Sequence, residues 1–461
     1  MIALSDAPAA ATEAPALRRL LGVTDLTLLA MGTVIGSGIF LVPAVVLRET
    51  GGTSGPAMLV WLAAGVLSLL GALTYAEMGA MKPEAGGLYV YVRDTFGPLP
   101  AFLYGWTSFF VIASGSTATL AVAFSGYLTE FVPLGRVASR AVSVLMIVVI
   151  ATINVRGTRK SATMQNWTTG VKVGALLLLS AALLMFGRAP NATAITWPVG
   201  FTPSLAVGMG AAMIGVLWAY EGWQYVTFSA GETRDPQRTF PLGITIATGA
   251  LVGLYLLVNF AYLAALGPAA AAASPRIAAD AASVVLGRAA GLVVGALILV
   301  SIFSAANGLI LTAPRVYFAM ARDGVFFERL AIVSPRFGTP AFAIIATAAW
   351  AMVLAVSGTF EQLLTFVVFT GWIFYGLGAL SVFVYRKRQP NAHRPFRVPG
   401  YPVTPLLFVL SAAGLVLNTV ITQPLRAAAG IGVVLLGTPA FFVWRARSRR
   451  EHLNPSPGIQ G

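Results

Sequence analysis

The chain has 461 residues, of which 57% are hydrophobic and only 10% are charged, whereas a soluble domain carries about 25% charged residues. The net charge of +14 would suggest a nucleic-acid partner in a soluble protein, but this composition excludes that class, and we expect no nucleic-acid partner. Cysteine is absent and the two histidines (His393 and His452) lie in basic polar segments, so we expect no disulfide, no metal centre and no cofactor.

Apolar runs near the length of about 20 residues that crosses a bilayer fill almost the whole chain. We therefore predict an all-α integral membrane protein with twelve transmembrane helices. If the N-terminus lies inside, most of the Lys and Arg residues fall on the inner side, which predicts a multi-pass protein of the cell (inner) membrane with both termini cytoplasmic. The spans are expected at about 25–47, 56–81, 98–131, 138–154, 162–186, 205–230, 241–266, 290–320, 340–356, 363–385, 406–420 and 428–443.

The segments outside these runs are short. Residues 1–20 are Ala/Pro-rich and lack the basic start of a signal peptide, so we predict a disordered cytoplasmic tail. We expect the transporter domain over 21–445 and a second cytoplasmic tail over 446–461. Segment 85–93 is too short to cross and carries two tyrosines beside Arg93, which predicts an amphipathic element at the membrane interface.

The first span contains the stretch Gly36-Ser37-Gly38 near its middle. Glycine disfavours a helix interior by about 1 kcal/mol relative to alanine, and broken backbone at membrane depth is tolerated only where it is buried in protein or lines a cavity. An unwound turn would direct the N–H groups of Ser37, Gly38 and Ile39 into the protein at the positive end of a half-helix, a site that suits a carboxylate. Alternatively, these small residues pack against a neighbouring helix.

The sixth span contains a second irregular stretch, in which Glu221 and Gly222 lie between Trp218 and Trp223. Interrupted helices in corresponding places of successive groups of five predict an inverted-repeat transporter, with substrate bound where the breaks meet. The repeats would cover about 21–190 and 200–388, followed by two extra helices over about 403–445.

Lys172 is the one basic residue well inside a span, and an intramembrane charge is by default a functional hypothesis. It lies about ten residues into the fifth span, too deep to reach the inner face comfortably. Its ammonium could stand where another transporter holds a sodium ion, bridging backbone carbonyls of spans 1 and 8, or it could carry a proton. The alternative is that Lys172 reaches the surface or pairs with another group for structural reasons alone.

Three other side chains near the second break have two interpretations each. Glu221 could attract a cationic or α-amino group or titrate, or it could only face an open vestibule. Trp218 and Tyr220 could gate the substrate, since an aromatic ring can close a cavity and face an ammonium, or they could be apolar filler. For Ser304, Asn307 and Thr370 we expect hydrogen bonds between helices.

The sequence carries no nucleophile–base–acid cluster and no phosphate-binding Gly-rich loop, so we expect neither an enzyme nor an ATPase. A substrate sensor on a transporter scaffold stays an alternative, although the polar tails are short for a signalling domain.

Four stretches, residues 32–40, 218–223, 231–241 and 314–324, resemble the amino acid–polyamine–organocation (APC) transporters, and above all the L-type amino acid transporter branch and its bacterial relatives. The resemblance covers about residues 20–445 in order. It implies a LeuT-type fold of five plus five inverted helices, discontinuous in helices 1 and 6, with two extra helices.

The same resemblance implies roles for single residues. The substrate carboxylate would bind the backbone of Gly36, Ser37 and Gly38, and the α-amino group would meet carbonyls near Ile35 and around the second break. In that break the implied residues are Trp218, Ala219, Glu221 and Gly222. The resemblance also implies that Trp218 gates the site and that Lys172 substitutes for sodium.

We therefore expect a sodium-independent transporter of L-amino acids, with neutral amino acids as the first choice of substrate, working as an exchanger or a uniport-like permease. The alternative is a proton-coupled symporter of neutral or cationic amino acids or polyamines. Animal members of the L-type branch have glycine where Glu221 stands, and Gly371 falls where some have a larger polar residue, so side-chain selectivity is not carried over. Without cysteine the chain has no disulfide-linked ancillary subunit.

Overall fold

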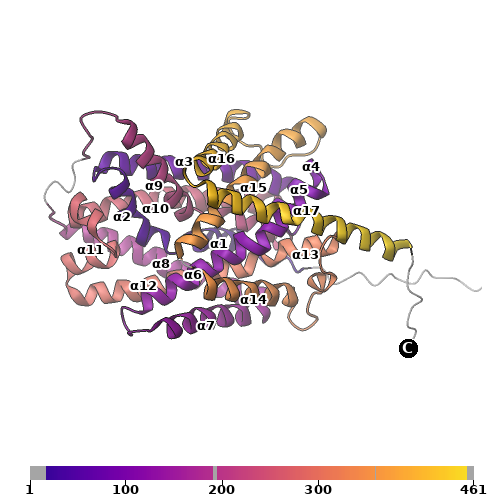
Figure 1. Ribbon diagram of the computed structural model, residues 1–461, viewed down its shortest axis with the longest axis horizontal. Coiled ribbons are helices and arrows are strands. Elements are labelled where there is room, and N and C mark those ends of the chain that lie inside the picture. The colour runs from indigo at the N-terminus through magenta and orange to yellow at the C-terminus, as the bar shows by residue number, and fades with distance from the viewer. Residues whose placement is uncertain (1–16, 190–194, 359, 454–461) are drawn as a thin grey trace, which may run out of the picture.

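The computed structural model describes residues 17–189, 195–358 and 360–453. In these residues the regular structure is helical, apart from one isolated bridge between Leu21 and Thr233. Most helices run along the long axis of the molecule, and the last one projects beyond the bundle at one end (Figure 1). The predicted tails fall largely outside the described residues. At the end of the first tail, the N–H group of Leu20 donates to the carbonyl of Glu232, as does that of the next residue, Leu21.

The described helices fall into two halves of the chain. The first half contains α1 (Val23–Val34), α2 (Gly38–Glu49), α3 (Ser54–Met81), α4 (Leu88–Phe96), α5 (Pro98–Thr107), the π-helical η1 (Ser108–Ile112), α6 (Ala113–Leu128), α7 (Arg136–Val155) and α8 (Thr158–Phe186). The second half contains α9 (Pro203–Ala219), the 3-10 segment η2 (Trp223–Glu232), α10 (Pro236–Ala273), α11 (Ile277–Leu286), α12 (Arg288–Thr312), α13 (Pro314–Arg322), η3 (Glu328–Ala331), α14 (Ala341–Ser357), α15 (Phe360–Arg388), α16 (Val403–Thr422) and α17 (Pro424–Leu453).

Length and composition make ten stretches of the described chain able to cross a bilayer. An eleventh is the pair α1 and α2, which is bent by 46° at the predicted first break. The predicted span at 340–356 corresponds to α14, which is apolar and 17 residues long. The structure therefore confirms a helical membrane protein of many spans, and the count of twelve stays a prediction.

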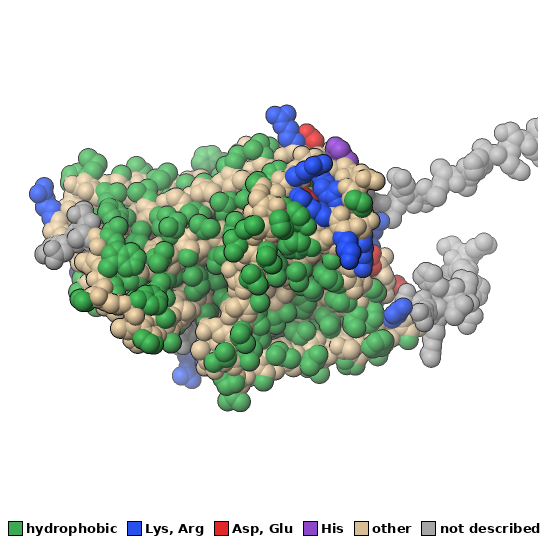
Figure 2. Space-filling model, turned by 90° about the horizontal axis from the view of Figure 1, so that it is seen from above, with side chains coloured by type: hydrophobic (Ala, Val, Ile, Leu, Met, Phe, Trp, Pro, Cys, Tyr) green, Lys and Arg blue, Asp and Glu red, His purple; other side chains and the backbone are tan. Residues whose placement is uncertain are grey.

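The outer faces of the bundle are apolar, as an acyl-chain environment requires. Large side chains such as Leu178 (75% exposed) and Trp167 (74% exposed) point outward from α8. Figure 2 shows hydrophobic side chains along one face of the bundle and Lys and Arg side chains gathered near one end. Since water would not tolerate so much contiguous apolar surface, lipid is the solvent for these faces.

The predicted interfacial element at 85–93 is packed inside the protein, so its two tyrosines do not face the bilayer. It forms α4, whose residues Tyr89 and Tyr91 are 1% and 0% exposed, and which packs against α5, α13 and α15. Two of its polar side chains share one partner: the Tyr89 hydroxyl donates to Asp323 at 2.7 Å, and Arg93 pairs with the same carboxylate at 2.9 Å. These contacts make burial of a Tyr/Arg-rich helix acceptable.

Two buried carboxylates tie helices together near one end of the bundle. Glu232 at the end of η2 pairs with Arg315 of α13 at 2.7 Å, and both side chains are 1% exposed. Glu77 of α3 accepts two hydrogen bonds from Arg386 of α15, at 2.7 and 2.9 Å. Each carboxylate is neutralised by an arginine, because an unpaired buried charge is costly.

The expected hydrogen bonds between helices are confirmed for two of three residues. Ser304 of α12 bonds Thr168 of α8 at 2.8 Å, and Asn307 donates to Gln165 of α8 at 2.8 Å. Thr370 instead donates to the carbonyl of Phe366, one turn earlier in its own helix. The polar face of α8 is thereby joined to α12 inside the bundle.

Candidate functional site

The break between α1 and α2 leaves three amide groups free. The N–H of Ile35 still donates to Met31 and that of Gly36 to Val34. Within residues 17–189, 195–358 and 360–453, the N–H groups of Ser37, Gly38 and Ile39 donate to no protein group. They stand at the start of α2, where the helix dipole adds positive potential. This geometry is the one that a carboxylate site requires.

Glycines let the two broken segments touch. A Cβ added to Gly38 would lie 2.6 Å from both Cα and Cβ of Ala219. Gly222, which ends the second break, has a φ of 135°, a conformation that favours glycine, and a Cβ there would lie 2.8 Å from the backbone nitrogen of Val34. The chain therefore brings the predicted breaks together backbone to backbone.

One side chain of α10 bridges both breaks. The hydroxyl of Tyr255 lies 3.2 Å from the carbonyl oxygen of Val34 in the first break and 3.1 Å from that of Ala219 in the second. A hydroxyl has a single proton, so it donates to one carbonyl at a time. Tyr255 is fully buried and holds the two segments at a fixed separation.

A small cavity of about 20 Å³ lies between the breaks. It has room for about one water molecule. Predicted residues that line it are Gly36, Ser37, Gly38, Trp218 and Glu221, joined by Thr33, Val34, Ser116, Leu120, Tyr225 and Leu309. The other predicted residues, Ile35, Ile39, Ala219 and Gly222, lie next to it in the two breaks without lining it.

Glu221 is the acidic group of this cavity. Its Oε1 accepts a hydrogen bond from Tyr375 of α15 at 2.9 Å, with the Tyr225 hydroxyl at 3.4 Å. Its Oε2 is buried without a partner among the described residues. Because the side chain is only 9% exposed, the interpretation of Glu221 as a solvated vestibule charge is excluded for this conformation.

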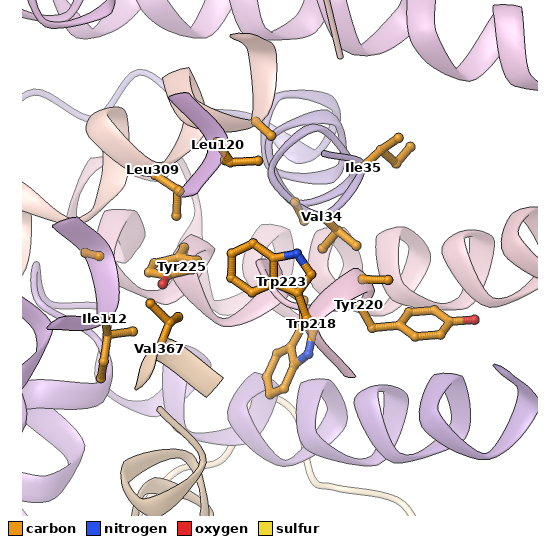
Figure 3. Close-up of a cluster of buried hydrophobic side chains, with 14 of the residues drawn as sticks. Val34, Ile35, Ile112, Leu120, Trp218, Tyr220, Trp223, Tyr225, Leu309 and Val367 are labelled. Atoms are coloured by element: carbon orange, nitrogen blue, oxygen red, sulfur yellow. The ribbon is translucent and has the colours of Figure 1, made fainter. Parts of the chain in front are cut away.

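The two predicted gating residues are placed differently. Trp218 lines the cavity and is 7% exposed. Tyr220 points away from Tyr225 and Leu309 (Figure 3), and its ring packs against Trp61 and Tyr255 with centroids 5.9 and 4.9 Å apart. It follows the last turn of α9, which turns its side chain toward α3 and α10. The structure therefore does not bring Tyr220 to the cavity.

Lys172 reaches across from α8 to the first break. Its Nζ donates to the carbonyls of Gly32 at 2.5 Å and Ile35 at 2.6 Å, and lies 3.5 Å from that of Ser301 in α12. The side chain is 2% exposed, and no described carboxylate pairs with it. The Lys172 amino group thus bridges backbone carbonyls of predicted spans 1 and 8, and it does not extend to the surface.

Comparison with known proteins identifies the family. The family model described as amino acid permease matches residues 21–441. The chain belongs to the amino acid permease family. This permease is 30% identical over 439 residues to the serine/threonine exchanger SteT of Bacillus subtilis (strain 168), covering 95% of this chain and 99% of SteT. It is 33% identical over 417 residues to the human b(0,+)-type amino acid transporter 1 (88% and 84% covered) and 31% identical over 431 residues to the human cystine/glutamate transporter (91% and 84% covered).

The comparisons confirm the family and the amino acid transport function that the sequence motifs predict. They do not specify the ion dependence or the substrate. Relatives named for different substrates share similar identity with this permease, so selectivity depends on its own side chains.

Sequence reasoning missed several residues of the site. Tyr225 and Leu309 line the cavity, and the Ser301 hydroxyl lies 3.0 Å from the carbonyl oxygen of Ile35 and 3.2 Å from that of Gly36, so it donates to one of them at a time. All three lie in apolar runs. A hydroxyl in a membrane helix is most often a quiet hydrogen-bonding group, and no local pattern separates these from the rest.

Proposed function

We propose that the permease is a sodium-independent transporter of L-amino acids, with neutral amino acids as the first choice of substrate. It would work as an exchanger or a uniport-like permease. The contact that supports this most is Lys172 Nζ on the carbonyls of Gly32 and Ile35, with Ser301 beyond. Oxygen ligands from two helices are what a sodium ion would need at this place. The ammonium occupies that place as a fixed cation, so the first break needs no added ion.

The substrate would lie between the two breaks. Its carboxylate would accept hydrogen bonds from the free amides of Ser37, Gly38 and Ile39. Its α-ammonium would face the unpartnered Oε2 of Glu221. The two ends of an amino acid zwitterion are thereby matched by opposite partial charges, and the side chain would extend along Trp218 and Leu309.

Transport would proceed by alternating access in a LeuT-type arrangement of twelve helices. The broken α1–α2 and α9–η2 pairs hold the first and sixth places among the predicted spans. Because a cavity of about 20 Å³ is too small for an amino acid, entry requires the segments around the breaks to separate. Trp218 is placed to act as the gate.

For location we propose the cell (inner) membrane with both termini cytoplasmic. The distribution of Lys and Arg among the predicted loops supports this orientation. The partners are then the amino acid and the lipid bilayer. A disulfide-linked subunit is excluded, because the chain has no cysteine.

A second candidate is proton-coupled symport of neutral or cationic amino acids or polyamines. It is favoured by the presence of two buried titratable side chains, Lys172 and Glu221, at the two breaks. In that mechanism one of them would exchange a proton during each cycle.

Reconstituted vesicles distinguish the two functions. Purified permease in liposomes is given a panel of labelled amino acids, with and without unlabelled amino acids inside and with and without a proton gradient. The first proposal predicts uptake that ignores the gradient and, for an exchanger, needs internal amino acid. Uptake into empty liposomes that an inward proton gradient accelerates would overturn it in favour of symport.

A further inference from the structure

A second cavity opens on the lipid-facing side of the bundle. It has a volume of about 360 Å³ and lies where α5, η1 and α6 meet α14, α15 and α17. We call it the α17 groove. Its wall includes Trp106, Phe110, Trp350, Ala429 and Leu436. Every residue that lines it is apolar, and Leu436 is 63% exposed, so the groove is open toward the surroundings of the bundle.

The side-chain N–H groups in the wall are already used. The indole N–H of Trp106 donates to the carbonyl of Val433 at 3.1 Å, and that of Trp350 donates to the carbonyl of Phe110 at 2.9 Å. No other side chain that lines the groove carries a donor or acceptor. An occupant therefore gains nothing from a polar group, and only an apolar chain or surface fits.

The groups that surround the groove indicate what occupies it. All the helices that form the groove are apolar, and residues of its mouth such as Leu436 are exposed on an apolar helix long enough to cross a bilayer, so we expect the mouth to face lipid. Phospholipid acyl chains are the apolar groups present at that depth. A flexible chain can enter a groove of this kind without any complementary polar contact.

The groove lies directly behind the substrate cavity. Gly115 of α6 lines the groove, while the next residue, Ser116, lines the cavity between the breaks. A Cβ on Gly115 would lie 2.8 Å from Val367 of α15, so packing at this wall is tight. The π-helical η1 forms the adjacent wall, and such segments are frequent at functional sites.

We propose that the α17 groove binds one acyl chain of a membrane phospholipid, and that this chain supports the segment of α6 that forms the wall of the substrate cavity. The proposal goes beyond amino acid transport itself. It assigns a lipid site to the permease and makes its transport rate depend on that site.

Two neighbouring alanines give a matched test. Ala429 lines the groove, whereas Ala428 is exposed on the same helix and does not line it. The permease is reconstituted with phosphatidylcholine that carries a photoactivatable diazirine in its acyl chain, and the labelled peptides are identified by mass spectrometry. We expect labelling of the peptides around Trp106 and Trp350. Ala429→Leu should reduce it severalfold, and Ala428→Leu should leave it unchanged.

The same variants test the link to transport. Ala429→Leu should change the amino acid exchange rate at least twofold, and Ala428→Leu should not. Equal labelling in the two variants would overturn the lipid site, and an unchanged exchange rate after loss of label would overturn the support of α6. The other possible occupant of the groove is a second copy of the permease. Since the chain has no cysteine, Leu436→Cys supplies a single thiol at the mouth of the groove. A disulfide-linked dimer of this variant, in place of lipid labelling, would overturn the proposal.

Discussion

Removing the hydroxyl of Tyr255 tests whether the two broken segments act together. The oxygen lies 3.2 Å from the carbonyl of Val34 and 3.1 Å from that of Ala219, but its one proton supports one hydrogen bond at a time. A buried hydrogen bond contributes about 1 kcal/mol net. Tyr255→Phe should therefore weaken amino acid binding about fivefold, because 1.4 kcal/mol corresponds to a tenfold change.

Tyr220 supplies the matched control. Its ring lies 4.9 Å from that of Tyr255, and its hydroxyl is buried without a partner among the described residues. Tyr220→Phe removes the same atom from the same cluster and should leave affinity unchanged. The assay is binding of a labelled amino acid to the purified protein. Full affinity in Tyr255→Phe, or an equal loss in Tyr220→Phe, would refute the bridging role.

Three further outcomes follow from the geometry. Lys172→Ala removes the cation on the α1 carbonyls and should abolish transport while the protein still elutes as a folded species on size-exclusion chromatography; wild-type rates would contradict this. Gly38→Val should eliminate amino acid binding, because even a Cβ would lie 2.6 Å from Ala219, and undiminished affinity would refute it. Arg315→Met leaves Glu232 buried without its cation, which should lower the free energy of unfolding by about 3–5 kcal/mol. The apparent melting temperature should therefore fall more in Arg315→Met than in the double variant Arg315→Met/Glu232→Leu.

The two breaks could be predicted because they depend on local chemistry. Gly36, Gly38 and Gly222 are poor residues for a helix interior, and their spacing within apolar runs marks where regular backbone ends. The structure places a bend of 46° at the first and a φ of 135° at Gly222 in the second. Lys172 was predictable for the same reason, since a charge in an apolar run needs a partner.

Features set by distant contacts could not be predicted. Tyr255 lies in an apolar run, and its partners are 221 and 36 residues away in the chain. The π-helical η1 contains no glycine or proline that would mark it, because one extra residue per turn leaves an apolar run equally apolar. The burial of α4 was missed because the partner of its Tyr89 and Arg93, Asp323, lies more than 200 residues away in the chain.

Glu221 could be predicted in part from the sequence. Its position inside a span made it a candidate for function, but its depth and orientation were open. The structure places it beside the free amides of the first break, bonded to Tyr375 through one oxygen. The second oxygen is buried and has no partner in the described part of the chain, which favours a bound ammonium.

We propose that Lys172 makes transport independent of sodium. The direct measurement is the exchange rate of a labelled amino acid in proteoliposomes, with sodium on both sides and then with choline on both sides. We expect equal rates, because the Lys172 ammonium would already occupy the carbonyls of Gly32 and Ile35. A rate that falls at least tenfold in choline and returns when sodium is titrated back would contradict it.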